Sequence, residues 1–258
     1  MENNSTEANA RYWAIVPAAG VGARMGSDRP KQYLPLAGRT VIEQSLDCLL
    51  NHPEITAAVV AISRTDGYWA DLAYQHTKPT HTAPGGTERF DSVLNALHYL
   101  HEMADDQDWV LVHDAARPCL RQADISRLME QCKNHSVGGI LAVPVKDTIK
   151  LSVKVSAKAS AKASTKQTLK NQTINKTVDR EPLWHAQTPQ MFRLGPLRDA
   201  LLQALADGVV VTDEASAMEH VGQYPLLIEG HADNLKITRP EDLPLAEFYF
   251  SQLSPTST

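Results

Sequence analysis

The chain has 258 residues, of which 43% are hydrophobic and 21% are charged, and its formal net charge is −5 at pH 7. This composition suits one large globular domain, or one domain with an appendage. It offers no global basic field for nucleic acid, and no apolar run is long enough to span a bilayer. The three cysteines, Cys48, Cys119 and Cys132, have no close pairing, which is typical of free thiols in a reducing cytoplasm.

The N-terminal part of the chain predicts a tail, a strand and a ligand-binding loop. Residues 1–10 are polar and lack the apolar core of a signal peptide, so we expect a loose tail. The apolar run 12–16 predicts a buried strand. The loop that follows begins with Ala18-Ala19-Gly20. Small residues let the backbone approach a ligand closely, and successive N–H groups bind anions.

Two cations, Arg24 and Lys31, follow this small-residue loop, so together they predict a cradle for a triphosphate. A P-loop does not fit, because no glycine in the chain precedes a lysine. A dinucleotide-binding loop does not fit either, because Gly20, Gly22 and Gly26 are spaced one residue too wide. An ordinary basic, glycine-rich turn stays open as an alternative.

Apolar runs and amphipathic patterns then alternate along the chain. This alternation predicts an α/β fold, with a mostly parallel sheet and helices on both faces, whose ligands bind beyond the carboxyl ends of the strands. We expect a single α/β catalytic domain from residues 11–147 and 181–250. The predicted strands are 57–62, 109–113, 139–144 and 224–228, and the predicted helices include 41–50, 92–100, 125–132 and 196–205. Further helix starts are predicted at Thr212-Asp213-Glu214 and, with capping-box spacing, at Thr238–Glu241.

Residues 148–180 break the pattern and predict a two-stranded β-arm. Apolar residues alternate at Leu151, Val153 and Val155, and Ile174 to Val178 can form the return strand. The tip, 156–172, is a lysine-rich low-complexity stretch. A nucleic-acid or membrane patch is conceivable, but without interleaved aromatics a solvated tip is favoured. Because an isolated hairpin is marginal in water, we expect the arm to pack on a second subunit.

Four further places carry chemistry-bearing residues. Gly85-Gly86 predicts a tight turn at a helix N-terminus whose backbone could read a base edge, with Ser92 facing the same way; a plain connection is the alternative. Asp114 ends a central strand and suits Mg²⁺ beside a triphosphate, or else it caps the following turn. His113 is expected to be packed or hydrogen-bonded rather than catalytic. Thr148 and Lys236 are individually weak candidates that also follow strand-like runs.

Together these segments resemble one family, the 2-C-methyl-D-erythritol 4-phosphate cytidylyltransferases of the non-mevalonate isoprenoid pathway. The matching segments run in family order from about residue 12 to 245. They are Pro17–Met25, Pro30–Tyr33, Gly85–Val93, Val112–Pro118, Asp147-Thr148, Trp184–Gln190 and Asp233–Thr238.

The resemblance implies a Rossmann-like nucleotidyltransferase fold with a protruding β-arm that exchanges contacts in a homodimer. It implies CTP and a sugar-alcohol phosphate as substrates, Mg²⁺ as cofactor, and release of pyrophosphate. Arg24 and Lys31 match the catalytic cations, and Asp114 matches the acid that contacts metal and substrate. The implied nucleotide-binding residues are Ala18, Ala19, Gly20, Gly85, Gly86, Ser92 and Lys236. The implied substrate-binding residues are Asp114, Arg117, Thr148, Arg180, Thr188 and Lys236, of which Arg180 and Thr188 reach the neighbouring subunit's site.

Three alternatives remain at this point. The acceptor could be ribitol 5-phosphate, whose cytidylyltransferases resemble this chain. A hexose-1-phosphate nucleotidyltransferase is more distant. A non-catalytic nucleotide-binding module should have lost Arg24, Lys31 or Asp114, and all three are present. The chain departs from the family in its tip, 156–172, which is longer than usual and leaves the length and order of the arm open.

Overall fold

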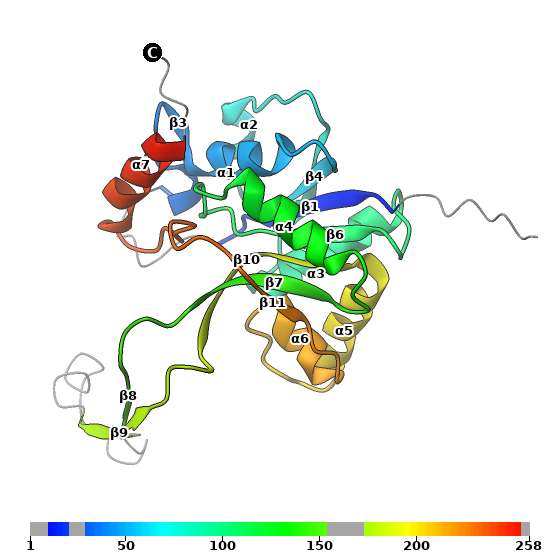
Figure 1. Cartoon of the computed structure of the whole chain (residues 1–258). Coiled ribbons are helices and arrows are strands. Elements are labelled where there is room, and N and C mark those ends of the chain that lie inside the picture. Colours follow the sequence, from blue (N-terminus) through cyan, green and yellow to red (C-terminus); the bar gives the residue numbers. More distant parts are fainter. Residues whose placement is uncertain (1–9, 21–28, 154–172, 254–258) are drawn as a thin grey trace, which may run out of the picture. The chain divides into compact units, whose positions relative to one another are not determined.

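The protein is described from a computed structural model that covers residues 10–20, 29–153 and 173–253 (Figure 1). The expected N-terminal tail therefore lies almost entirely outside the described residues. The chain divides into two compact units, one made of the residues up to Ala142 and from Ala186 onward, the other of Val143–His185. The domain limits expected from the sequence, 11–147 with 181–250 and 148–180, stay a prediction. Among the described residues, no helix has the length and apolar character needed to cross a membrane.

A seven-stranded sheet forms the centre of the larger unit, in the order β11-β7-β10-β6-β1-β4-β5. The pairs β1–β4, β1–β6, β4–β5 and β7–β11 are parallel, whereas β10 pairs antiparallel with β6. The mostly parallel α/β fold predicted from the sequence is therefore confirmed. The strands are β1 (Tyr12–Pro17), β4 (Ile55–Ile62), β5 (Thr80–Pro84), β6 (Trp109–Val112), β7 (Gly138–Pro144), β10 (Trp184–Arg193) and β11 (Leu226–Glu229).

The helices follow the predicted alternation. They are the short 3₁₀ helix η2 (Lys31–Tyr33) and the helices α1 (Val41–Leu50), α2 (Trp69–Leu72), α3 (Arg89–His101), α4 (Gln122–Cys132), α5 (Leu194–Ala206), α6 (Glu214–His220) and α7 (Asp242–Leu253). Two short strands, β2 (Pro35–Leu36) and β3 (Arg39–Thr40), pair with each other just before α1.

Alternate residues of β1 explain why helices cover both faces of the sheet. Trp13 and Ile15 belong to one buried cluster, which also holds apolar residues of α3, α5 and α6. Ala14 and Val16 belong to another, with apolar residues of α1 and α4. Successive side chains of a strand point to opposite faces, so a fully apolar strand requires a core on each side. The expectation of helices on both faces is confirmed.

The start of α7 corrects one local prediction. The spacing of Thr238 and Glu241 predicts a capping box with the helix starting at Arg239, but the helix begins three residues later, at Asp242. The backbone N–H and the hydroxyl of Thr238 donate to Asp242 Oδ2, at 2.8 and 3.0 Å, and the N–H of Arg239 donates to the same oxygen. Asp242 therefore provides the N-terminal acceptor that the pattern assigned to Glu241.

The smaller unit contains an antiparallel pair, β8 (Ile149–Ser152) and β9 (Ile174–Val178), in which Ile149 lies opposite Val178. The alternating pattern predicted a strand that starts at Leu151, but β8 starts two residues earlier, at Ile149. The lysine-rich tip, 156–172, lies outside the described residues. At the base of the pair, the N–H of Val145 donates to the carbonyl of Leu183 at 3.0 Å.

Candidate active site

Four loops meet at one edge of the larger unit, because the parallel strands β1, β4, β5 and β6 all end there. Two adjoining pockets lie at this edge and share Pro17, Gly20 and Arg89. Beyond these shared residues, the first pocket is lined by Ala18, Lys31, Gln32, Asp114, Ala115, Ala116 and Lys236. The second is lined by Ala19, Gly86, Thr87, Glu88 and Ser92. The position matches the rule that ligands of α/β sheets bind beyond the carboxyl ends of strands.

Hydrogen bonds to both of its flanks hold the start of the small-residue loop. The N–H of Ala18 donates to the carbonyl of Ala61 at the end of β4, at 2.8 Å. The buried amide of Gln32 donates to the carbonyls of Ala18 and Gly20, at 2.7 and 3.1 Å. Gln32 was not among the predicted site residues, although it directly follows Lys31. Arg24 lies outside the described residues, so its predicted role stays a prediction.

The turn at Gly85 and Gly86 is packed too closely for larger residues. A Cβ on Gly85 would lie 2.3 Å from the Cβ of Ala19, and one on Gly86 would lie 2.1 Å from the Cβ of Asp91. The hydroxyl of Ser92 accepts a hydrogen bond from the N–H of Gly86 at 3.0 Å. Ser92 is therefore part of the support of the turn as well as of the pocket wall.

Asp114 is surrounded by cations from three other places in the chain. Its Oδ1 lies 2.9 Å from Arg89 Nε, and its Oδ2 lies 2.8 Å from Lys236 Nζ and 3.4 Å from Arg117 Nε. Burial alone would raise the pKa of Asp114, but the three cations outweigh it and hold the pKa far below its usual range. The carboxylate is therefore ionised at neutral pH, and its contacts are those of an ion cluster rather than of a turn cap.

The loop that carries Lys236 is attached to this cluster. Lys31 Nζ donates to the carbonyl of Ile237 at 2.9 Å, and an Arg117 guanidinium nitrogen donates to the carbonyl of Asn234 at 2.6 Å. The buried amide of Asn234 in turn donates to the carbonyl of Thr188 at 2.8 Å. The first two of these bonds join residues that lie 206 and 117 positions apart in the chain, and the third joins residues 46 positions apart.

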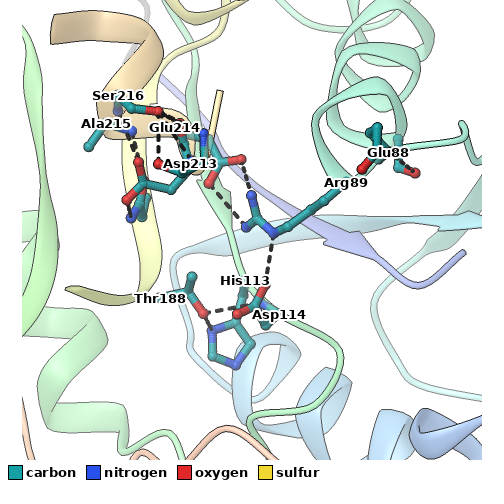
Figure 2. A network of polar contacts seen from close by, with 12 residues as sticks. Glu88, Arg89, His113, Asp114, Thr188, Asp213, Glu214, Ala215 and Ser216 are labelled. Carbon is teal, nitrogen blue, oxygen red and sulfur yellow. Dashed lines mark hydrogen bonds and ion pairs between the residues drawn. The ribbon is translucent and has the colours of Figure 1, made fainter. Parts of the chain in front are cut away.

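His113 is a buried neutral residue that orders the backbone beside Asp114 (Figure 2). Burial lowers the pKa of His113 to about 4. Its Nε2 faces the carbonyl of Arg117 at 3.0 Å, so this nitrogen carries the proton, and Nδ1 accepts the hydroxyl hydrogen of Thr188 at 3.0 Å. The Thr188 oxygen accepts the N–H of Asp114 at 3.1 Å. The expectation that His113 is hydrogen-bonded and packed agrees with this arrangement.

Arg89 and Glu214, like Gln32, belong to the site but were not among the predicted site residues. The guanidinium of Arg89 lies between two carboxylates: besides Asp114, it binds Glu214 through two nitrogens, at 2.6 and 3.1 Å (Figure 2). Glu214 is fully buried. The one sequence feature that could have identified Arg89 as a site residue is its position in the segment Gly85–Val93. Glu214 was predicted only as part of a helix start.

The structure brings most of the predicted residues together, but not all of them. Thr148 and Arg180 belong to the smaller unit, where an Arg180 guanidinium nitrogen donates to the carbonyl of Lys146. Thr188 and Arg117 contact Asp114 or its backbone rather than line either pocket. Among the described residues, no group of three or more His, Cys, Asp or Glu side chains could hold a metal ion. A metal ion at this site would therefore need ligands from its substrates in addition to Asp114.

Comparison with known proteins gives one consistent result. The sequence model of the family described as IspD, 2-C-methyl-D-erythritol 4-phosphate cytidylyltransferase, matches residues 12–252. A protein of that name from Pseudomonas putida is 52% identical over 233 residues, which cover 90% of this chain and 92% of the relative. One from Vibrio vulnificus is 52% identical over 239 residues, 93% and 94% of the two chains.

Solved structures are similar as well. A crystal structure of the Francisella tularensis enzyme of that name superposes with a TM-score of 0.75 at 37% identity, covering 93% of this chain and all of the other. A crystal structure titled 4-diphosphocytidyl-2C-methyl-D-erythritol synthase gives a TM-score of 0.76, also at 37% identity, and covers 93% and 98% of the two chains.

Proposed function

Because this chain belongs to the IspD family of 2-C-methyl-D-erythritol 4-phosphate cytidylyltransferases, we propose that the two adjoining pockets beyond β1 and β6 are its active site. The chain is a nucleotidyltransferase that converts CTP and 2-C-methyl-D-erythritol 4-phosphate into the CDP-linked alcohol and pyrophosphate, in isoprenoid precursor biosynthesis. The observation that carries the site assignment is the meeting of Lys31, Arg89, Lys236 and Asp114 in one pocket next to the small-residue loop.

The reaction needs charge compensation more than proton transfer. A phosphate oxygen of the acceptor attacks the α-phosphorus of CTP; the new P–O bond forms as the bond to the β-phosphate breaks and pyrophosphate leaves. The attacking oxygen is already ionised at neutral pH, so no general base is required. Positioning and electrostatic stabilisation therefore account for the catalysis. Lys31 and Lys236, together with Arg24, are the residues we assign to the phosphates.

The two pockets divide the substrates between them in this proposal. The second pocket, with the glycine turn and Ser92, accommodates the cytidine, whose base edge can pair with backbone groups of the turn. The first pocket, with Lys31, Asp114 and Lys236, takes the phosphates. Arg117 and Thr188 hold Asp114 in place through its carboxylate and its N–H.

The donor chemistry at Asp114 fits one Mg²⁺ ion. Mg²⁺ is commonly held by one or two carboxylates together with phosphate oxygens, and Asp114 supplies a carboxylate to the first pocket. Its partner Lys236 has a side chain that is 37% exposed and flexible, so it can turn from the carboxylate towards a phosphate. Asp114 would hold the ion, which would add positive charge beside the triphosphate.

The smaller unit is proposed to act in a homodimer. The pair β8–β9 is too small to be stable alone, which supports packing on a second subunit. In that arrangement Arg180 of one chain would complete the active site of the other chain, as the family resemblance implies. The three free cysteines of this chain, of which Cys119 and Cys132 are buried, support function in a reducing cytoplasm.

Pyrophosphate release from CTP tests the assignment directly. We expect release with 2-C-methyl-D-erythritol 4-phosphate and at least tenfold lower kcat/KM with ribitol 5-phosphate, since loss of well-placed substrate contacts costs specificity on about that scale. The same assay with ATP, GTP or UTP checks the base preference of the second pocket. Faster turnover with ribitol 5-phosphate would contradict the assignment of the acceptor.

A further inference from the structure

We propose that Glu214 is a positioning residue of this enzyme, which acts through Arg89 to fix the direction of the Asp114 carboxylate in the pocket. Glu214 does not line either pocket, so it has no direct route to a substrate. It is fully buried, and both of its carboxylate oxygens bind the Arg89 guanidinium. The proposal rests on the active-site assignment made above.

The geometry of the Arg89 guanidinium makes this coupling specific. Two of its nitrogens bind the two oxygens of Glu214, while its Nε is directed at Asp114 Oδ1, 2.9 Å away (Figure 2). The guanidinium is planar and its donors stand in a rigid fork. When Glu214 holds two of the donors, the plane of the guanidinium is set, and with it the line along which Asp114 Oδ1 is held.

The position of Glu214 is itself determined by a second buried residue, Gln190 of β10. Its amide oxygen accepts the N–H of Ala215 at 2.9 Å, and its amide nitrogen donates to Asp213 Oδ2 at 2.9 Å. Gln190 thus binds the residues on either side of Glu214 at the first turn of α6. Gln190 lies opposite Val112 of β6, the strand that leads to Asp114. The pairing of β10 with β6 therefore sets the start of α6 relative to Asp114.

The charges explain why such an arrangement is kept. A buried carboxylate without a partner is strongly destabilising, and one arginine here serves two of them. Arg89 also lies on the boundary between the two pockets, which share it. All three nitrogens of the Arg89 guanidinium bind carboxylates, so the group cannot turn towards the triphosphate. Its charge therefore stays at Asp114, and Lys31 and Lys236 bind the phosphates.

The test compares Glu214→Gln with Asp108→Asn. Asp108 is a matched control: it is buried, it binds Arg11 and Trp13, and it precedes β6, whereas Asp114 follows that strand. We expect E214Q to lower kcat about tenfold to a hundredfold, the range found when groups that orient site residues are removed. We expect D108N to lower the melting temperature at least as much while kcat stays within twofold of the wild-type value.

Arg89→Lys provides the second variant, because lysine has no fork and cannot orient both carboxylates at once. We expect R89K to lower kcat by about the same factor as E214Q. The double variant R89K/E214Q should lower kcat no further than the less active of the two single variants, because both changes disrupt the same interaction. If E214Q does not fold, R89K alone carries the comparison with D108N.

A readout that does not depend on activity is the side-chain Nε–H signal of Arg89 in an NMR spectrum, assigned by its loss in R89K. We expect a slowly exchanging signal in the wild-type protein and a shifted, rapidly exchanging one in E214Q. A kcat of E214Q within twofold of D108N, or an unchanged Arg89 signal, overturns the proposal. A wild-type protein that releases no pyrophosphate contradicts the proposed function instead, and the NMR comparison still decides the coupling.

Discussion

Lys236 Nζ lies 2.8 Å from Asp114 Oδ2, so the one carboxylate that the described residues contribute to the first pocket is paired with a lysine from the last part of the chain. The pair joins the end of β6 to the loop before α7 across 122 positions of sequence (236 − 114). It also places a flexible cation directly beside the carboxylate assigned to Mg²⁺. Any ligand of Asp114 must compete with Lys236 or work alongside it.

Asp114→Asn is expected to reduce turnover by on the order of a hundredfold, because the amide keeps the shape but loses the charge that a hard cation and Lys236 both need. The Mg²⁺ concentration that gives half-maximal activity should rise as well. A Mg²⁺ titration of pyrophosphate release checks both effects, with D108N as the control. An unchanged titration curve would leave Asp114 with a structural role only.

Lys31→Ala should lower kcat about 10²–10³-fold, the loss found when one transition-state contact of about 3–4 kcal/mol is removed. Arg24→Ala is expected to behave alike. A matched control is Lys78→Ala, whose Nζ also donates to backbone carbonyls, those of His52 and Pro53, away from both pockets. Turnover is measured at saturating CTP and folding by thermal melting. Near-wild-type turnover of the Lys31 variant would remove that residue from the mechanism.

Gly85→Ala should destabilise the protein by roughly 1–3 kcal/mol and weaken CTP binding, because the added methyl group would overlap the Cβ of Ala19 in the small-residue loop. Gly67→Ala is the control: the structure leaves open space around that position and its backbone needs no positive φ. Urea unfolding and calorimetric titration with CTP measure the two effects. Equal behaviour of the two variants would mean that the turn can move away from the loop at little cost.

We expect the free energy of unfolding to fall in mild acid because of the buried His52. Burial lowers its pKa below the ordinary value of about 6.5, and its Nδ1 accepts the N–H of Glu54, so the folded state favours the neutral ring. A lowered pKa means that the unfolded chain binds the proton first. The stabilising contribution is therefore complete above pH 6.5 and is lost as the pH falls below it.

Urea midpoints between pH 8 and 5 measure this effect. The decrease attributable to His52 is at most about 1.4 kcal/mol per pH unit, the limit for one titrating group. The total decrease in the free energy of unfolding between pH 8 and 5 should be smaller in His52→Gln than in the wild-type protein. A substitution of the exposed His98 of α3 is the control and should leave this decrease unchanged. A pH dependence that survives the His52 substitution in full would assign the loss to other groups.

The arm prediction is tested with mixed dimers. Arg180→Ala should depress activity without unfolding the protein, and deletion of 156–172 with a short turn in its place should leave the dimer and its activity largely intact. In dimers that combine an Arg180→Ala chain with a Lys31→Ala chain, one of the two sites regains both residues. We expect roughly half of wild-type activity in verified mixed dimers. If no activity is recovered, Arg180 does not contribute to the active site of the other subunit.

Local patterns in the sequence were sufficient for most elements of the sheet. The apolar runs that became β1, β6 and β7 are buried on both faces, and such runs are visible without any tertiary information. Strand β10 was missed as a strand: Gln187, Thr188 and Pro189 are polar or lack an N–H, which argues against a central strand. It forms there because β6 and β7 flank it and because Gln190 and Thr188 make buried hydrogen bonds, with the N–H of Ala215 and with His113.

The sequence by itself determined the class of fold, the small-residue loop, the glycine turn and the identity of Lys31, Asp114 and Lys236 as candidates, because each stands in a short motif after a strand. Only the tertiary structure decided that Arg89 joins Asp114 to Glu214. Glu214 lies 125 positions after Arg89 in the chain. Pairing at such a separation depends on how Gln190 of β10 places the first turn of α6, so that Glu214 reaches Arg89. No local periodicity records that choice, since a buried glutamate at a helix start has the same sequence pattern as an exposed one.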